Sequence, residues 1–434
     1  MTATLLRLAT AGSVDDGKST LVGRLLHDAQ AILADQLEAV ARSSQQGDSE
    51  LDLALLTDGL RAEREQGITI DVAHRYFATD RRSFVLADCP GHVQYTRNTV
   101  TGASTADAVV LLVDVRHGVV EQTRRHLAVA HLLRVEQVII AVNKIDALDY
   151  QEAPFRRVEA EVARIAAELG APQPLVVPVS ALRGDNVVTP SQNTPWYQGQ
   201  ALLPILEELP DADEAGRRTE PLRLPVQTTI RPDSEFRGCA GQIVAGTLGP
   251  GDEVLIQPGG HRTSVKAVHR TALQRRVAAS DRARAPESVV VELDGQFDVA
   301  RGSLLAAPDS PATELDELAL KLAWLGDGAL TPGAQVLIKH GTQTLKALVV
   351  EISDRLELST LTPQPADELV LNDIGTVTLR LARALPVDDY ATAKGTGAVL
   401  LIDPADGNTL AAGMVQIPAK VEQEASDGLA WLEG

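Results

Sequence analysis

Residues 12–20 read GSVDDGKST, a loop that contains two glycines and runs into Gly-Lys-Ser-Thr. This pattern is that of a phosphate-binding loop, in which backbone amides and the start of the next helix surround an anion. The apolar run before it (5–10) predicts a strand and the segment after it (19–30) predicts a helix, which is the context that the motif requires. The loop therefore predicts a nucleoside triphosphate site, although two acidic residues, Asp15 and Asp16, stand inside it.

Each loop residue has an expected part in this site. Lys18 is expected to reach the terminal phosphates and Ser19 to ligate Mg²⁺. The other loop residues are expected to contact the nucleotide, mainly through backbone amides: Gly12, Ser13, Val14, Asp15, Asp16, Gly17 and Thr20. The alternative is a chance glycine turn, so the loop alone predicts a nucleotide but not which one.

Two segments supply the groups expected around Mg²⁺ and the γ-phosphate. DCPGH (88–92) ends a predicted strand with Asp88, which suits a Mg²⁺ contact, and its turn at Pro90 and Gly91 presents an amide to the γ-phosphate. His92 is the candidate for orienting the attacking water. GITI (67–70) supplies Thr69, whose hydroxyl would reach Mg²⁺ only when its loop folds over the γ-phosphate. The predicted catalytic residues are thus His92, Lys18 and Thr69.

Two further segments specify guanine. NKID (143–146) ends a predicted strand, and Asp146 can accept hydrogen bonds from N1–H and the 2-amino group, which adenine does not offer together. Asn143 would brace the loop and the Lys144 stem would lie along the base. The backbone of Ser180, Ala181 and Leu182 (SAL) would donate to guanine O6. Each piece alone could be a turn, a cap or a strand residue, but five in this order predict a GTPase.

Apolar patterning divides the chain into an α/β part and a β part. Val-, Ile- and Leu-rich runs alternate with helical stretches over residues 1–210, which predicts a mostly parallel sheet with helices on both faces. The polar segment PDADEAGRRTEP (210–221), with a proline at each end, predicts a linker over residues 211–221. Short strands separated by turns follow in residues 222–312 and 313–434, which suits antiparallel barrels or sandwiches. We expect three domains.

Composition narrows the class of protein. The 434 residues carry a formal charge of -19, which disfavours unselective adhesion to nucleic acid or anionic lipid. The two cysteines, Cys89 and Cys239, lack metal-ligand spacing and fit a reducing compartment. No signal peptide or membrane-spanning run is apparent. We expect a soluble, cytoplasmic protein that binds neither membrane nor nucleic acid.

The GITI, DCPGH, NKID and SAL set resembles the translation-factor class of GTPases, typified by elongation factor Tu. This resemblance implies an α/β P-loop GTPase domain followed by two antiparallel β-barrel domains. Translational members usually carry histidine at the position of Asp16. One alternative function is therefore that of an elongation factor that delivers aminoacyl-tRNA. The residue Asp16 and the segment RPDSEFRG (231–238) argue against this alternative.

Longer segments narrow the resemblance to one family. GSVDDGKSTLVGRLLHD (12–28), LDLALLTDGLRAEREQGITIDVAHRYF (51–77), PGHVQYTRNTVTGAS (90–104), RPDSEFRGCAG (231–241), DVARGSLLAA (298–307) and GTGAVLLID (395–403) look like the large, GTP-binding subunit of bacterial sulfate adenylyltransferase. Val93 departs from the acidic residue expected after PGH.

The family implies both a partner and a coupled reaction. A separate small subunit would transfer the adenylyl group of ATP to sulfate, giving adenosine 5′-phosphosulfate and pyrophosphate, and GTP hydrolysis here would drive that transfer. The chain has no second Gly-Lys loop, so a fused kinase for 3′-phosphorylation is not expected. A GTP-sensing scaffold with weak hydrolysis is a further alternative.

The two loop aspartates have two interpretations. In the first, their side chains cap loop amides or face solvent, away from the anion. Alternatively, Asp15 helps to hold a monovalent cation beside the β- and γ-phosphates, and Asp16 contacts a switch segment.

Overall fold

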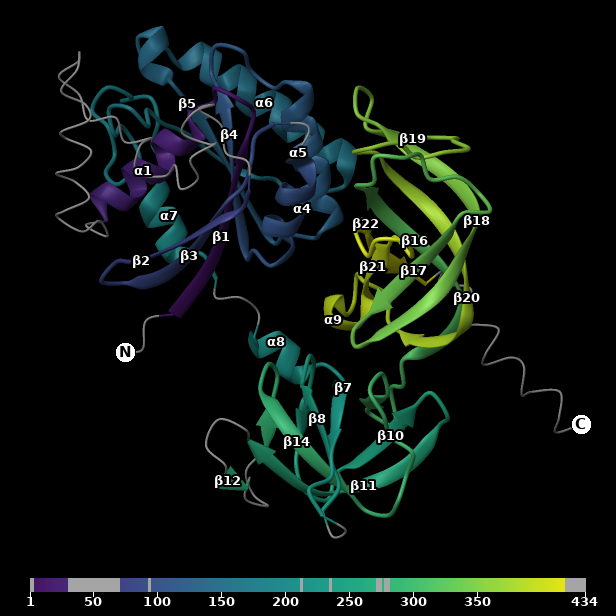
Figure 1. Cartoon of the computed structure of the whole chain (residues 1–434). Coiled ribbons are helices and arrows are strands. Elements are labelled where there is room, and N and C mark those ends of the chain that lie inside the picture. The colour runs from purple at the N-terminus through teal and green to yellow at the C-terminus, as the bar shows by residue number, and fades with distance from the viewer. Residues whose placement is uncertain are drawn as a thin grey trace, which may run out of the picture. The chain divides into compact units, whose positions relative to one another are not determined.

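The computed structural model describes residues 4–29, 71–92, 95–210, 214–233, 236–270, 275–276 and 282–417 (Figure 1). The chain forms two compact units, Met1–Ala212 with Glu357–Thr362, and Asp213–Leu356 with Pro363–Gly434. The predicted GITI segment, with Thr69, and the unusual Val93 lie outside the described residues. We describe each unit by itself.

The first unit is built on one six-stranded sheet in the order β2-β3-β1-β4-β5-β6. All its neighbouring pairs are parallel except β2 with β3, which places an antiparallel strand at one edge. This confirms the predicted mostly parallel sheet. The strands are β1 (Thr4–Gly12), β2 (Ala73–Ala78), β3 (Arg82–Asp88), β4 (Ala108–Asp114), β5 (Gln137–Asn143) and β6 (Leu175–Pro178).

Helices cover both faces of this sheet (Figure 1). One face packs against Leu21 and Leu25 of α1 and Leu206 of α7. The other packs against Leu127 of α5 and Phe155 of α6. The helices are α1 (Lys18–Asp28), α4 (Thr96–Ser104), α5 (Glu121–Leu132), the 3-10 helix η3 (Ile145–Leu148), α6 (Glu152–Leu169) and α7 (Leu202–Glu208). We did not predict α4 from the sequence, because its polar, threonine-rich segment lacks a clear apolar period.

The second unit contains two closed antiparallel rings of six strands each. The first ring runs β10-β15-β7-β8-β14-β11 and closes through a β10–β11 pairing. Its strands are β7 (Arg223–Ile230), β8 (Gly238–Gln242), β10 (Glu253–Gln257), β11 (His261–Arg270), β14 (Ser288–Leu293) and β15 (Leu304–Ala306). The short strands β9 (Thr247–Leu248), β12 (Arg275–Arg276) and β13 (Ala283–Arg284) are added outside this ring.

The second ring runs β17-β21-β22-β16-β20-β18 and closes through a β17–β18 pairing. Its strands are β16 (Thr313–Trp324), β17 (Gln335–His340), β18 (Gln343–Glu357), β20 (Ile374–Val387), β21 (Ala398–Ile402) and β22 (Thr409–Gln416). The short elements β19 (Thr362–Gln364) and α9 (Lys394–Gly397) accompany it. The predicted fold, a GTPase domain followed by two antiparallel β-barrels, is therefore confirmed.

The segment that we predicted as a linker holds a short helix, α8 (Glu214–Thr219), before β7 begins at Arg223. Helix-favouring residues in EAGRRT account for this turn of helix. The proposed domain limits at residues 210, 221 and 312 stay predictions. Among the described helices, none combines the length and apolar composition needed to cross a membrane.

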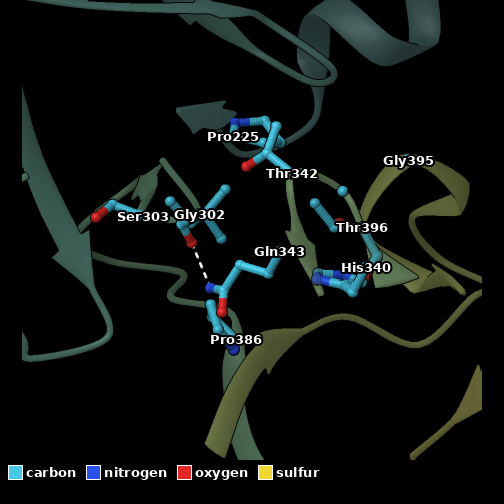
Figure 2. A pocket seen from close by; sticks show the side chains of 11 residues that line it. Pro225, Gly302, Ser303, His340, Thr342, Gln343, Pro386, Gly395 and Thr396 are labelled. Carbon is cyan, nitrogen blue, oxygen red and sulfur yellow. Dashed lines mark hydrogen bonds between the residues drawn. The ribbon is translucent and has the colours of Figure 1, made fainter. Parts of the chain in front are cut away.

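A buried ion pair joins the two barrels. Arg223 Nε and Nη2 donate to the two carboxylate oxygens of Asp388 at 2.8 and 2.9 Å, and the side chains are 6% and 13% exposed. Figure 2 shows the small pocket beside this junction, where Gln343 of β18 donates to the carbonyl of Gly302. The bidentate Arg223–Asp388 pair thus joins one barrel to the other, and the Gln343 hydrogen bond adds a second connection.

Arg82 is a buried cation that holds the C-terminal end of α7. Its side chain is 2% exposed, and its guanidinium donates to the carbonyls of Leu206 at 3.3 Å, Leu209 at 2.5 Å and Pro210 at 3.3 Å. The last carbonyls of a helix lack partners within the helix and carry partial negative charge. Arg82 therefore satisfies acceptors that would otherwise be buried without a donor.

We expect Arg82→Met to lower the unfolding free energy of the first unit by about 2–4 kcal/mol, because buried carbonyls would lose their charged donor. Urea unfolding and amide hydrogen exchange of Leu202–Glu208 measure this loss. The matched control is Arg81→Met, whose side chain is 62% exposed and pairs with Glu207 at 3.4 Å. The control should change stability by no more than about 0.5 kcal/mol. Equal effects of the two substitutions would contradict the role of Arg82.

Candidate functional site

The site lies where the parallel strands of the first unit end. Gly12 ends β1, Asp88 ends β3, Asn143 ends β5, and Ser180 follows β6 shortly after its last residue. The carboxyl ends of parallel strands meet at one edge of a sheet, and ligands of open α/β sheets bind there. The topology therefore gathers four of the five predicted motifs at one edge, and the fifth, GITI, lies outside the described residues.

The loop after β1 has the backbone conformation of an anion-binding nest. Asp15 and Gly17 lie in the left-handed region, with φ of 66° and 90°, and α1 begins at Lys18. Alternating left-handed residues turn successive amides toward one point. A Cβ at Gly17 would approach Asn143 Nδ2 to 2.4 Å, and one at Gly91 would approach the Gly12 carbonyl oxygen to 2.4 Å. Both glycines are therefore needed for the close packing around the loop.

Lys18 and Asp88 form a buried ion pair beside this loop. Lys18 Nζ donates to Asp88 Oδ1 at 2.9 Å, and the side chains are 7% and 2% exposed. Thr10 Oγ1 donates to the same oxygen at 3.0 Å. The pair places the ammonium next to the carboxylate that we predicted as a Mg²⁺ contact.

Asp16 is folded into its own loop. Its Oδ2 accepts the Ser13 N–H at 2.7 Å, and the residue is 5% exposed. Burial raises the pKa of Asp16 to about 6; the Ser13 amide opposes this shift, while the Asp114 carboxylate adds to it. The structure thus shows the amide-capping interpretation for Asp16. It records no contact with a switch segment among the described residues.

Asn143 connects the base-recognition segments with the phosphate loop. Its Nδ2 donates to the Asp16 carbonyl at 2.7 Å, and its Oδ1 accepts the Ala181 N–H at 2.9 Å. The side chain is 2% exposed, so both hydrogen bonds are shielded from water. One amide therefore joins the loops that follow β1, β5 and β6.

Lys144 adds a second connection to the phosphate loop. It lies in the left-handed region, with φ of 63°, and its Nζ donates to the Asp15 carbonyl and lies 3.1 Å from Asp114 Oδ2. The Lys144 stem therefore runs from the end of β5 back to the loop after β1.

Sequence reasoning missed Asp114, which ends β4 and is 1% exposed. Burial would raise its pKa, but hydrogen bonds from Arg116 and Lys144 outweigh that effect and lower the pKa to about 2. Asp114 thus stays ionised and holds Lys144 in place. Asp114 could have been predicted as a site residue from the sequence, because the apolar run AVVLLVD (108–114) ends with an aspartate just as SFVLAD (83–88) does.

The remaining predicted base contacts lie on the same side. Asp146 is half-buried on η3, directly after Lys144 and Ile145. Ser180 is fully buried, and Leu182 is 46% exposed. No nucleotide contact is shown for these residues, so their roles stay predictions.

His92 follows the turn that touches the phosphate loop. Its Nδ1 is buried and has no hydrogen-bond partner among the described residues. Its ring lies edge-on to Tyr95, with centroids 6.1 Å apart. One ring nitrogen is therefore unpaired within the described part of the chain and is buried from water.

Two family models match parts of this chain, and a search of solved structures found a structural neighbour. Residues 3–215 match the elongation factor Tu GTP binding domain, and residues 317–416 match the GTP-eEF1A C-terminal domain-like family. A crystal structure of Sup35 complexed with GMPPNP aligns with 95% of this chain and 94% of its own, at 21% identity and a TM-score of 0.43.

Curated relatives are more similar. Sulfate adenylyltransferase subunit 1 of Laribacter hongkongensis is 45% identical over 96% of this chain and 86% of its own length. The same subunit of Methylorubrum populi is 46% identical over 95% and 87%. The bifunctional enzyme CysN/CysC of Mycobacterium tuberculosis is 45% identical over 95% of this chain and 67% of its own length. The chain belongs to the sulfate adenylyltransferase subunit 1 family, within the elongation factor Tu type of GTPases.

Proposed function

We propose that this chain is the GTPase subunit of a heteromeric sulfate adenylyltransferase and that its GTP hydrolysis drives formation of adenosine 5′-phosphosulfate. A separate small subunit would carry out adenylyl transfer from ATP to sulfate. The observation that carries the nucleotide part is the Asn143 side chain, which joins the phosphate loop to the SAL loop. The sulfate part is supported by the names of the relatives.

The phosphates of GTP fit the loop of residues 12–20. Left-handed Asp15 and Gly17 form the nest, α1 opens at Lys18, and a side chain at Gly17 would collide with Asn143. Oxygen donors for Mg²⁺ are also present, since Asp88 is a buried carboxylate and Ser19 stands in the first turn of α1. Ser19 and Asp88, with Thr69, would hold Mg²⁺, which neutralises phosphate charge when bound.

Guanine would be read by the loops that Asn143 holds. Asp146 would accept from N1–H and the 2-amino group, and the SAL backbone would donate to O6. Asp114 keeps Lys144 in position through its 3.1 Å contact, so that the lysine stem can lie along the base. Buried polar groups paired in this way reject a base that leaves them unpaired.

His92 is the residue that we assign to the attacking water. Its unpaired, buried Nδ1 is consistent with a ring that takes a partner only when nucleotide and water are bound. Gly91, directly before it, packs against the Gly12 carbonyl, so His92 follows a segment in contact with the phosphate loop. Loss of the γ-phosphate would be sensed by that segment and by the loop of Thr69.

Coupling requires that the partner bind the GTP and GDP states with different affinity. A partner that distinguishes the states shifts their populations, and linkage makes the effect reciprocal. The small subunit would therefore stimulate hydrolysis when ATP and sulfate are present, and hydrolysis would in turn draw the adenylyl transfer forward.

Asp15 is the candidate for a monovalent cation site. Asp15 is exposed, its backbone lies in the left-handed region, and its carbonyl accepts a hydrogen bond from Lys144 Nζ. The carboxylate would help to hold an alkali cation that offsets phosphate charge. Equal rates of GTP hydrolysis in potassium and lithium salts would remove this assignment.

The first prediction is that Asp146→Asn exchanges guanine preference for xanthine preference. The amide donates where the carboxylate accepted, which matches the 2-oxo group of xanthine. Competition between GTP and xanthosine triphosphate measures the exchange. Asp149→Asn, three residues further along the same segment, serves as the control and should keep the preference for GTP. A variant at 146 with the wild-type preference would show that Asp146 does not read the base.

The second prediction concerns coupling. With the reconstituted pair of subunits, adenosine 5′-phosphosulfate should exceed its GTP-free equilibrium only while GTP is hydrolysed. His92→Ala should keep GTP affinity, slow hydrolysis by roughly 10²-fold or more and suppress the excess product. Product yield with GTP is compared with the yield with a non-hydrolysable analogue. Equal yields would mean that the GTPase only assembles the complex.

The third prediction is a pH dependence set by Asp16. Its folded pKa, about 6, lies above the ordinary value of 3.8, so the folded state binds this proton more tightly than the unfolded chain does. Relative to Asp16→Asn, the wild-type unfolding free energy should therefore fall as pH rises from about 4 to about 6 and then level off. The full change corresponds to about 3 kcal/mol. Urea unfolding of both proteins across this range measures it, and a constant difference would contradict the buried, titrating carboxylate.

A further inference from the structure

Arg24 of α1 forms hydrogen bonds to the loop that follows β6, which contains Ser180, Ala181 and Leu182 and is called the SAL loop below. Its Nε donates to the Ala181 carbonyl at 3.2 Å, and its Nη2 donates to the Leu182 carbonyl at 2.5 Å. Gly184, with φ of 85°, lies against the same side chain, since a Cβ there would be 3.8 Å from Arg24 Cζ. One guanidinium thus binds two neighbouring carbonyls of this loop, and a side chain at position 184 would contact it.

Three other backbone N–H groups of the loop are bonded within it. The Gly184 N–H donates to the Ser180 carbonyl at 2.7 Å, and the Arg183 N–H donates to Ser180 Oγ at 3.1 Å. The Ser180 N–H in turn donates to the Asp185 carbonyl at 3.1 Å. Within this turn, the carbonyls of Ser180 and Asp185 accept hydrogen bonds from loop N–H groups. The carbonyls of Ala181 and Leu182 instead accept from Arg24.

The loop is consequently held from two directions. Asn143, at the end of β5, accepts the Ala181 N–H, while Arg24, on α1, binds the carbonyl of the same residue. In a trans peptide the C=O and the next N–H point in opposite directions. A carbonyl of Ala181 that is turned toward α1 therefore turns the Leu182 N–H away from α1. Arg24 fixes the orientation of the peptide groups expected to meet guanine O6.

We propose that Arg24 is a positioning residue for guanine recognition, which aligns the SAL backbone amides with O6 from its place on the phosphate-binding helix. This inference rests on the proposed guanine site and deepens it. Arginine suits the role because its planar fork offers several donors in fixed directions, enough for two neighbouring carbonyls. Arg24 Nη1 also lies 3.7 Å from Asp28 Oδ1, in a partly exposed ion pair that contributes little to the orientation of the fork.

The position of Arg24 also connects the two halves of the nucleotide. α1 begins with Lys18 and Ser19, the predicted phosphate and Mg²⁺ contacts, and Arg24 lies less than two turns further along. A shift of α1 toward bound phosphate would carry the guanidinium, and with it the SAL loop. Phosphate binding and O6 recognition are therefore linked through one rigid helix.

The experiment measures affinities of the full chain for GDP, 6-thio-GDP and IDP by competition against a fluorescent nucleotide. Sulfur accepts hydrogen bonds weakly, so 6-thio-GDP reports the O6 contact, while IDP lacks the 2-amino group and reports the Asp146 contact. Arg24→Ala should lower the preference for GDP over 6-thio-GDP by about fivefold to tenfold and leave the preference for GDP over IDP unchanged. Arg24→Lys, which keeps one donor group, should restore part of the first preference.

Asp28→Asn is the matched control, because it removes the ion pair but keeps both carbonyl hydrogen bonds of Arg24. It should keep both preferences. Equal weakening of all three nucleotides by Arg24→Ala, or no weakening, would overturn the inference, since a purely structural role does not distinguish O6 from sulfur. Asp146→Asn tests the proposed site itself. If that variant keeps its preference for GDP over IDP while Arg24→Ala loses the O6 preference, the assignment of Asp146 fails and that of Arg24 stands.

Discussion

The nucleotide edge of the first unit depends on one buried amide. Asn143 has two hydrogen-bonding ends, and they bind different loops: the carbonyl of Asp16 in one direction and the N–H of Ala181 in the other. A donor and an acceptor on one planar group fix the relative position of both partners, which neither a carboxylate nor an ammonium could do. Removing this amide would leave two buried backbone groups unpaired in loops without other regular structure to hold them. The close approach of Gly17 to the same side chain shows that the phosphate loop is packed on this amide as well as bonded to it.

The buried acidic residues of this site differ in how their negative charge is compensated. Asp114 is ionised between Arg116 and Lys144, and Asp88 is paired with Lys18. Burial raises the pKa of Asp16 to about 6, because it outweighs the lowering effects of the Ser13 amide and of Lys144. Of the two acidic residues in the phosphate loop, Asp16 therefore has a structural role that the hydrogen bonds explain. The Asp16 side chain is buried and stabilises the shape of the loop through its hydrogen bond from the Ser13 amide.

Much of the fold followed from local pattern. The apolar runs 108–113 and 138–142 lie within β4 and β5, because the middle of a strand that is buried on both faces is apolar. The motif order also placed Asn143 and Ala181 at neighbouring strand ends. Tertiary contacts were beyond the sequence: Arg24 and Ala181 are separated by 157 positions, and Arg82 and Leu206 by 124. Nothing in LVGRLLHD or DRRSFVL distinguishes an arginine that binds distant carbonyls from one that faces water. The polar helix α4 was missed for a related reason, since its buried threonines, Thr96 and Thr99, read as loop residues.

Closure of the two barrels has a consequence for association between molecules. An open sheet presents unpaired N–H and C=O groups along its outer strands, and those groups can recruit strands from other chains. In the second unit every long strand has a neighbour on each side, and the added strands β12 and β19 are two and three residues long. Templates for intermolecular β-pairing are accordingly scarce in this part of the described chain.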